Sequence, residues 1–350
     1  MRTIMPVYEK GIALVFEVSQ GCIMGCQGCQ INKELSGTPP EHKLNMLLEL
    51  VSDLKDSKLT EFEFGPTDMV RARNRDELFQ HPKIKQLASH FEMLTLNASF
   101  VYTEQNEYVD LAKAVNAFNT SKYNGLQIPL NLKHLYNDKY VQLIETNLQA
   151  YKSTLDKPLK EVIFTVIVDD LLIGNVGTEI NYDSLYERCK QLQEKGYGFD
   201  FISHHGLRDV TEPGVRDDFI KTLKKINAAM YSKSLENNDV NNRRYGELKS
   251  FTESAEIVYH EGELYVRATV REKSNIFHEN MRYKGAWRGV DLTAHLVERF
   301  NDNMAKSFNY KDCQDCHRRV DCSIRYIHDV MDIMETDECI VGLKDIPIPV

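Results

Sequence analysis

The chain has 350 residues, 42% of them hydrophobic and 27% charged, and a formal net charge of −9. This composition is typical of a globular protein with a sizeable core, and the acidic charge excludes a broad basic face for nucleic acid. No apolar run near the start is as long as a signal peptide core or a membrane span. We therefore expect a cytoplasmic protein without a membrane or nucleic-acid partner, whose eight cysteines stay out of disulfides.

The first two-thirds of the chain alternates short apolar runs with amphipathic stretches. Strands are expected at 12–18, 61–64, 93–97, 125–130, 162–168 and 199–203, and helices at 41–55, 76–90, 106–118, 135–151, 182–195 and 214–233. Leu44, Leu47 and Val51, for example, share one helical face. Six strand–helix units in succession predict an α/β fold with a parallel sheet. The periodicity leaves open whether the sheet is doubly wound or a partial (β/α)6 barrel.

The pattern changes in the last third of the chain. Residues 235–244 are polar and Asn-rich, which is typical of a linker. Segments 256–260 and 263–270 flank Glu261-Gly262, a hairpin signal, and a helix is expected over 291–306 before a second group of cysteines. We therefore predict a first domain over 1–235, a linker over 236–255 and a small α+β domain over 256–350.

Three cysteines follow the first expected strand closely. Cys22, Cys26 and Cys29 form a C-x3-C-x2-C motif on the loop at that strand's carboxyl end, where α/β folds build their active sites. Three thiolates can hold three irons of a four-iron cluster and leave the fourth iron open for another ligand. A zinc knuckle is the alternative, but zinc takes four ligands and no fourth lies nearby in the sequence.

This motif, in this position, resembles the signature of the radical S-adenosylmethionine superfamily. The resemblance implies a partial (β/α)6 barrel and a 4Fe–4S cluster whose open iron chelates S-adenosylmethionine. It also implies reductive cleavage of that cofactor to a 5′-deoxyadenosyl radical, which abstracts a substrate hydrogen. The family usually has an aromatic residue just before the third cysteine, where this chain has Gly28. No adenine ligand is therefore assigned.

Polar residues at the ends of the next strands are the candidates to bind the cofactor. Gly65, Thr67 and Asp68 resemble the family's Gly-Gly-Glu-Pro turn, which receives the methionine ammonium group, although an ordinary Gly-Pro turn explains them equally well. Three residues at the ends of the third and fourth strands are candidates for the ribose: Ser99, Gln127 and Asn131.

Four further residues have a catalytic interpretation and a structural one. His204 and His205 follow the sixth expected strand, where one of them could act as a general acid or base, cap a helix or bind a phosphate. Cys189 lies on the apolar face of an expected helix, which favours a buried structural thiol. Trp287, the single tryptophan, is expected to be a packing residue.

The second group of cysteines is Cys313, Cys316, Cys322 and Cys339. Four thiolates form a closed site, either a structural zinc or a 4Fe–4S cluster. The spacing resembles the SPASM domain that follows the barrel in many radical enzymes. That domain has a further cysteine where this chain has Tyr326, so the resemblance implies a reduced SPASM domain with one auxiliary cluster.

A closed cluster is suited to electron transfer. The two resemblances together imply an oxidoreductase with two 4Fe–4S clusters and S-adenosylmethionine. They also imply that it acts on a peptide or protein and receives electrons from an external one-electron reductant of the flavodoxin or ferredoxin type. One alternative is a radical dehydrogenase or mutase of a small molecule, such as a sugar or an amino-acid derivative. A second is a zinc-binding module without catalysis.

Overall fold

The computed structural model describes residues 11–17, 37–65, 67–168, 181–203, 255–266, 281–316, 319–324, 327–333 and 335–339. The strands are β1 (Ile12–Glu17), β2 (Leu59–Phe64), β3 (Met93–Asn97), β4 (Tyr123–Asn131), β5 (Leu159–Val168), β6 (Gly198–Ser203), β7 (Ala255–His260) and β8 (Glu263–Val266). The helices are α1 (Glu41–Asp53), α2 (Arg75–Gln80), α3 (Pro82–Ala88), α4 (Gln105–Phe118), α5 (Leu132–Leu135), α6 (Asp138–Thr154), α8 (Tyr182–Glu194), α10 (Gly289–Ser307), α11 (Arg319–Ile324) and α12 (Ile327–Ile333), with a 3-10 turn η3 at Lys311–Cys313.

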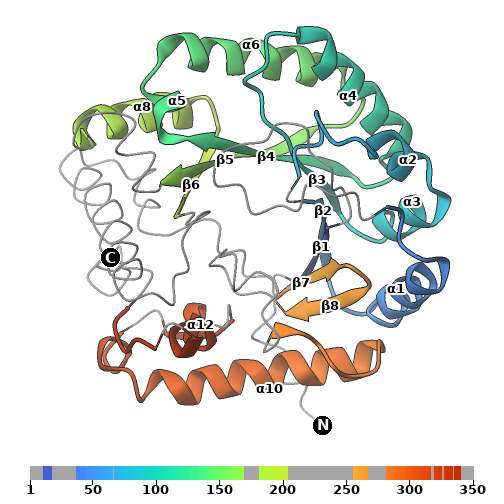
Figure 1. Ribbon diagram of the computed structural model, residues 1–350, viewed down its shortest axis with the longest axis vertical. Coiled ribbons are helices and arrows are strands. Elements are labelled where there is room, and N and C mark those ends of the chain that lie inside the picture. Colours follow the sequence, from blue (N-terminus) through green and yellow to red (C-terminus); the bar gives the residue numbers. More distant parts are fainter. Residues whose placement is uncertain are drawn as a thin grey trace.

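The described strands form one sheet in the order β6-β5-β4-β3-β2-β1-β7-β8. Strands β1 to β6 are parallel neighbours in chain order. A doubly wound sheet reverses its strand order at a switch point, and this sheet does not. Right-handed crossovers that advance in one direction place the helices on one side, and Figure 1 shows α1 to α6 and α8 along the outer side of the strands. The α/β prediction is confirmed, in the form of a partial barrel.

The hairpin β7–β8 extends this sheet beyond β1. The strand β7 pairs in parallel with β1 and antiparallel with β8. At the turn, Glu261 and Gly262 have φ values of 47° and 85°, the left-handed conformation that a tight hairpin turn requires. The expected hairpin is confirmed, and its second strand is described over Glu263–Val266.

One helix prediction is wrong. A single helix was expected over 76–90, and the chain forms α2 and α3 instead. His81 between them is extended, with φ −74° and ψ 117°, and Pro82 is the first residue of α3. Proline disfavours a helical conformation of the residue before it and is well tolerated at the first helical position. The helix expected over 135–151 is confirmed as α6, which begins three residues later at Asp138, and the short α5 precedes it.

The outer face of the sheet carries the core. Phe16 packs on Phe62 and Phe64, with ring centroids 5.5 and 6.0 Å apart, and Phe64 contacts Phe79 of α2 and Phe118 of α4. Alternation along each strand then turns the neighbouring residues to the concave face. The concave face, unlike the core, carries several carboxylates and amides.

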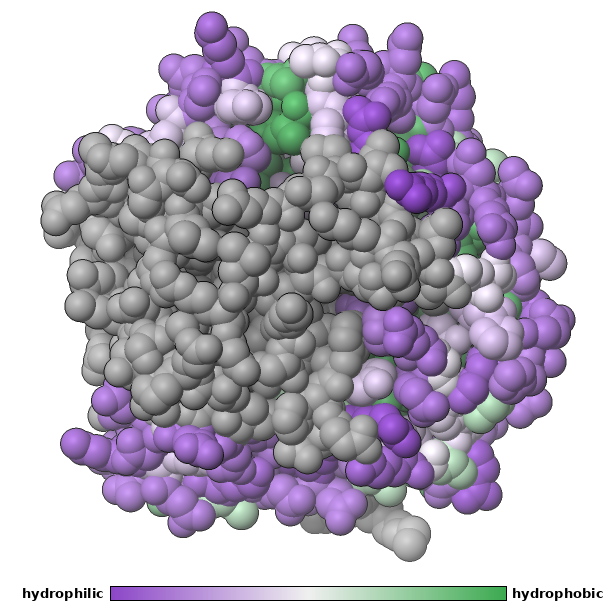
Figure 2. All heavy atoms as spheres, viewed as in Figure 1, coloured by the Kyte–Doolittle hydropathy of each residue, from purple (hydrophilic) through white to green (hydrophobic). Residues whose placement is uncertain are grey.

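The helix α10 connects the last segments to the barrel. Figure 1 shows it beside β7 and β8, with α12 next to it. The backbone N–H of Gly289 donates to Asp53 Oδ2 of α1 at 3.3 Å, and a side chain at Gly289 would meet Asp53. In Figure 2 the described part of the visible face is mainly hydrophilic. None of the described helices is long and apolar enough to cross a membrane.

Candidate active site at the carboxyl ends of the strands

A buried carboxylate joins three neighbouring strands near their carboxyl ends. Glu63 of β2 is 4% exposed. Its Oε1 accepts from Asn97 Nδ2 of β3 at 2.7 Å, and its Oε2 accepts from Gln127 Nε2 of β4 at 3.0 Å. A Cβ at Gly65 would lie 2.8 Å from Glu63 Oε1 and 2.9 Å from Asn97 Nδ2. Only glycine therefore leaves this close approach intact.

A second buried carboxylate lies on the segment after β2. Asp68 Oδ1 accepts the backbone N–H of Val70 at 3.0 Å, and the hydroxyl of Tyr102 donates to Asp68 Oδ2. The Arg71 guanidinium lies 4.3 Å from the centroid of the Tyr102 ring. Burial raises the pKa of Asp68 to about 6, although the hydrogen bonds from Tyr102, Ser99 and Val70 act in the opposite direction. Burial therefore brings the pKa of Asp68 about two pH units above that of an ordinary aspartate.

The hydroxyl of Thr67 is a buried polar group that still lacks a hydrogen bond. Thr67 is completely buried, and its Oγ1 has no hydrogen-bond partner. A buried hydroxyl without a partner is costly, and a ligand that donates or accepts a hydrogen bond would satisfy it. The unpaired Thr67 hydroxyl, the close approach at Gly65 and the carboxylates of Glu63 and Asp68 fit a cofactor with an ammonium group.

The structure divides the expected cofactor-binding residues into three groups. Gly65 and Gln127 are brought together by Glu63. Thr67 precedes Asp68 in the sequence, and a backbone hydrogen bond connects Ser99 to the Asp68 carboxylate. Asn131 is used differently, because its side chain caps α5 in a reciprocal arrangement with His134.

The first strand ends in a buried acid–base pair. Glu17, the last residue of β1, is 2% exposed, and its Oε2 lies 3.6 Å from Nδ1 of His260 on β7. Burial lowers the pKa of His260, more than the neighbouring Glu261 and the Glu17 backbone raise it. Sequence reasoning missed this pair because it depends on β7 lying beside β1.

The concave face carries further acidic side chains around Glu61. Burial raises the pKa of Glu61 to about 8, and the charges of Glu63, Glu161 and Glu256 act in the same direction. Sequence reasoning also missed Glu61 and Glu63. Their signal was a pair of glutamates alternating with phenylalanines in β2, which places the acids on the face opposite the core.

Several predicted site residues lie outside the described residues. They are Cys22, Cys26, Cys29, His204 and His205, and their roles stay predictions. Two structural assignments are described. Cys189 is completely buried in α8, and Trp287 packs edge-on against Tyr259 at 6.2 Å.

The four C-terminal cysteines are free thiols, and all four are buried to a similar extent. Cys313, Cys316 and Cys339 are each 8% exposed, and Cys322 is 7% exposed. Burial raises the pKa of the Cys313 thiol to about 12, with further contributions from Cys339 and Cys316. Asp312 Oδ2 accepts the backbone N–H of Cys339 at 2.9 Å. This bond ties the last cysteine to the segment that carries the first.

An unsatisfied histidine lies near these cysteines. His328 is completely buried, and both of its ring nitrogens lack a hydrogen-bond partner. Its ring stacks on Tyr310 at 5.7 Å, and the Tyr310 carbonyl accepts the N–H of Cys313 at 3.0 Å. Four thiols and a buried N–H donor are the residue types that would hold an iron–sulfur cluster, whose sulfur atoms accept hydrogen bonds. Across the described residues, no three His, Cys, Asp or Glu side chains are arranged to hold a metal ion.

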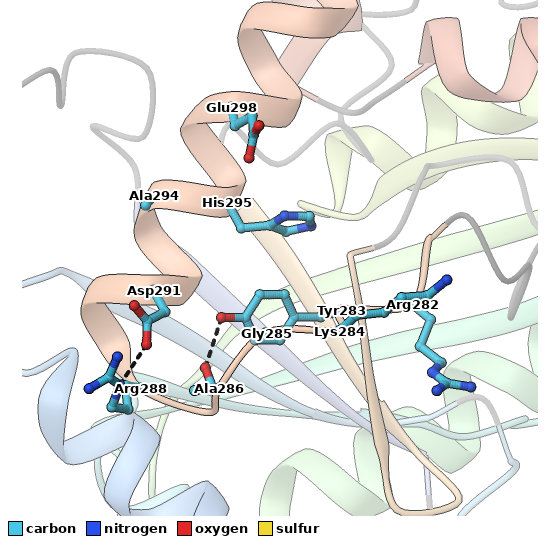
Figure 3. Close-up of a pocket in the computed structure, with 10 residues that line it drawn as sticks. All are labelled: Arg282, Tyr283, Lys284, Gly285, Ala286, Arg288, Asp291, Ala294, His295 and Glu298. Atoms are coloured by element: carbon cyan, nitrogen blue, oxygen red, sulfur yellow. Dashed lines mark hydrogen bonds and ion pairs between the residues drawn. The ribbon is translucent and has the colours of Figure 1, made fainter.

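A separate cavity of about 750 Å³ lies between the segment before α10 and the first half of that helix. Figure 3 shows the His295 ring beside Tyr283, whose hydroxyl donates to the Ala286 carbonyl at 2.8 Å. Arg288 is held by Asp291 at 2.6 Å. None of the predicted site residues lines this cavity.

Comparisons with known proteins give structural likenesses alone. No family model matches the chain, and no curated protein matches it. Streptococcus suis SuiB bound to S-adenosylmethionine is 14% identical with a TM-score of 0.38, over 65% of this chain and 45% of SuiB. SuiB bound to the precursor peptide SuiA is 15% identical with a TM-score of 0.40, over 65% and 47%. Native anSMEcpe with bound AdoMet is 14% identical with a TM-score of 0.49, over 89% and 88%. In both of these SuiB comparisons the chain spans less than half the length of SuiB.

Proposed function

We propose that this protein is a radical S-adenosylmethionine oxidoreductase. The observation that carries the proposal is the position of the first cysteine motif. Cys22 follows shortly after Glu17, which ends the first strand of a six-unit partial barrel. Cys22, Cys26 and Cys29 would hold a 4Fe–4S cluster with one open iron. When bound, that cluster would supply the electron that cleaves S-adenosylmethionine to a 5′-deoxyadenosyl radical.

The described residues have separate roles in this proposal. Asp68 and the Glu63 carboxylate would receive the methionine ammonium group, since both are fixed by hydrogen bonds before a ligand arrives. Thr67 Oγ1 would hydrogen-bond the same part of the cofactor. Gln127 and Ser99 are the proposed ribose neighbours. Asn131 remains a weaker candidate because its side chain already caps α5.

The substrate proposed for this site is a peptide or protein.

A second 4Fe–4S cluster would be held by Cys313, Cys316, Cys322 and Cys339. Because it would have no open position, it would exchange electrons and would not bind substrate. In a net oxidation, the substrate radical left by hydrogen abstraction loses one further electron, which the second cluster would accept, and a proton. His204 or His205, and the Glu17–His260 pair, are groups that could take that proton.

The test replaces Cys22, Cys26 and Cys29 together by Ala. The variant should lose about half of its iron, one of two four-iron clusters, and should no longer convert S-adenosylmethionine to 5′-deoxyadenosine with dithionite. Cys189→Ala is the matched control, because this buried thiol lies on α8. Cofactor cleavage by the triple variant at the wild-type rate would refute the assignment.

A further inference from the structure

The cavity of about 750 Å³ beside α10 is bounded by two elements. One wall is the segment 282–288, which we name the strap, and the other is one face of α10. The strap is attached to β8, the last strand of the sheet, because the backbone N–H of Tyr283 donates to the Leu264 carbonyl at 2.8 Å. A cavity of this volume is typical of sites for small ligands.

The helical wall sets the length of the cavity. Its lining residues on α10 are Asp291, Ala294, His295 and Glu298, and this spacing places them on one face of the helix. Asp291 and Glu298 are separated by about 10 Å along the helix axis. A small organic molecule, or an extended peptide segment of about three residues, has this length.

The charged groups of the lining leave an excess of positive charge. Three cations and two acids line the cavity: Arg282, Lys284, Arg288, Asp291 and Glu298. Arg288 and Asp291 compensate each other, since Arg288 Nε lies 2.6 Å from Asp291 Oδ2. Arg282 has an ion pair with Glu263, which does not line the cavity, but this pair is long at 3.9 Å. The remaining lining charges therefore favour a ligand with a single negative charge.

An imidazole nitrogen on the helical wall is buried without a hydrogen-bond partner. Burial and the Arg299 charge lower the pKa of His295, although Glu298 and Asp329 act in the opposite direction, so the ring is neutral at neutral pH. Its Nε2 has no hydrogen-bond partner, and Figure 3 shows the ring projecting from α10 toward the strap. A neutral imidazole can donate one N–H to a carboxylate, which would offset the cost of this burial.

We propose that this cavity binds an organic monocarboxylate with a short apolar body, presented either as a free acid or as the acidic side chain of a peptide segment. The carboxylate would accept hydrogen bonds from Arg282, Lys284 and His295, since cationic donors bind carboxylates more strongly than neutral donors do. The apolar body would lie against Ala286 and Ala294, which also line the cavity. The site requires neither of the proposed clusters.

Isothermal titration calorimetry of the full chain at low salt tests the proposal with two blocked tripeptides. Acetyl-Ala-Glu-Ala-amide carries one carboxylate, and acetyl-Ala-Gln-Ala-amide has nearly the same shape without the charge. The protein should bind the glutamate peptide about tenfold more tightly, as expected for hydrogen bonds to a charged group. Added salt should weaken the binding of the glutamate peptide.

Substitutions in the lining locate the bound carboxylate. Arg282→Gln and Lys284→Gln should each weaken its binding about threefold. His295→Phe keeps a ring beside Tyr283 but removes both nitrogens, and should weaken binding about tenfold. Lys139→Gln is the matched control for the exposed Lys284, because Lys139 is exposed near the start of α6. Carboxylate binding that none of the three lining substitutions weakens would overturn the assignment to this cavity.

A third ligand, 4-acetamidobutyrate, distinguishes the two sources of the carboxylate. It carries the same acid without flanking residues. Tighter binding of the glutamate peptide would identify a peptide segment as the ligand, and equal or tighter binding of 4-acetamidobutyrate would identify a free acid. The proposal is overturned if neither carboxylate binds, or if the glutamine peptide binds as tightly as the better of the two.

Discussion

Asp68 gives the proposed cofactor site its expected pH dependence. Its pKa is raised to about 6 because burial outweighs its hydrogen bonds, so the carboxylate is charged above this pH and neutral below it. A cationic ammonium group binds the charged form. We predict that the affinity for S-adenosylmethionine is about fourfold lower at pH 5.5 than at pH 7.5, because only about a quarter of the Asp68 carboxyl is charged at the lower pH.

Equilibrium dialysis of the cluster-loaded protein between pH 7.5 and 5.5 would measure this effect. Asp68→Asn keeps an acceptor for Val70 and should bind weakly at every pH. Glu161→Gln is the matched control, since Glu161 lies on the concave face of β5 and should keep the wild-type pH profile. An Asp68→Asn variant with the wild-type profile would show that another group causes the titration.

The sequence predicted individual candidate residues of the site but not their hydrogen-bond partners. The Gly-Pro turn pointed to Gly65, Thr67 and Asp68. Glu63 was missed because its importance arises from Asn97 and Gln127 on two other strands, and the register between strands is not visible in one strand. Asn131 was expected at the cofactor because it ends a strand, but it also begins a helix.

At the scale of elements, the partly buried carboxylate of Asp329 connects α12 to α10. Asp329 pairs with Arg299 and Lys306, and its backbone N–H donates to Asn303 Oδ1 at 3.2 Å. Loss of one partner of a buried pair leaves the other charges uncompensated. We predict that Asp329→Asn lowers the free energy of unfolding by about 2–4 kcal/mol.

Asp332→Asn is the control for this prediction. Asp332 of α12 also pairs with Lys306 of α10, but the Asp332 side chain is 46% exposed. Its replacement should therefore lower the free energy of unfolding by only about 0–1 kcal/mol. Urea unfolding of both variants, with iron retention measured in parallel, gives the comparison. Equal losses of stability in the two variants would contradict the role of Asp329.

Element positions were predictable where one sequence pattern acts locally. All six expected barrel strands form, with boundaries that differ by a few residues. Pro82 marks the break between α2 and α3 in the sequence. The prediction missed this break because the helical period continues on both sides of the proline. The pairing of β7 with β1 joins residues about 240 positions apart, and no local pattern encodes it.

At the scale of the whole molecule, the two proposed clusters are expected to have separate roles, so that one can be removed without loss of the other. Replacing Cys313 and Cys316 by Ala removes two of the four proposed ligands of the second cluster. The first motif is on a different part of the chain, so the variant should still cleave S-adenosylmethionine with dithionite but fail to complete substrate turnover. Ligand-rich segments fold together with their metal, so soluble, monodisperse protein is required.

Full product formation by soluble Cys313/Cys316 double variant would contradict the electron-transfer role. The second cluster would then serve stability alone. Cys189→Ala again provides the control for loss of a buried thiol, because it removes a cysteine that belongs to neither motif.

The central claim is that this chain cleaves S-adenosylmethionine reductively at an iron–sulfur cluster. It is tested most directly by anaerobic purification, followed by iron and sulfide analysis and by incubation with dithionite and the cofactor. The account predicts a brown protein with about eight irons per chain and formation of 5′-deoxyadenosine. A colourless protein that contains zinc and produces no 5′-deoxyadenosine would contradict it.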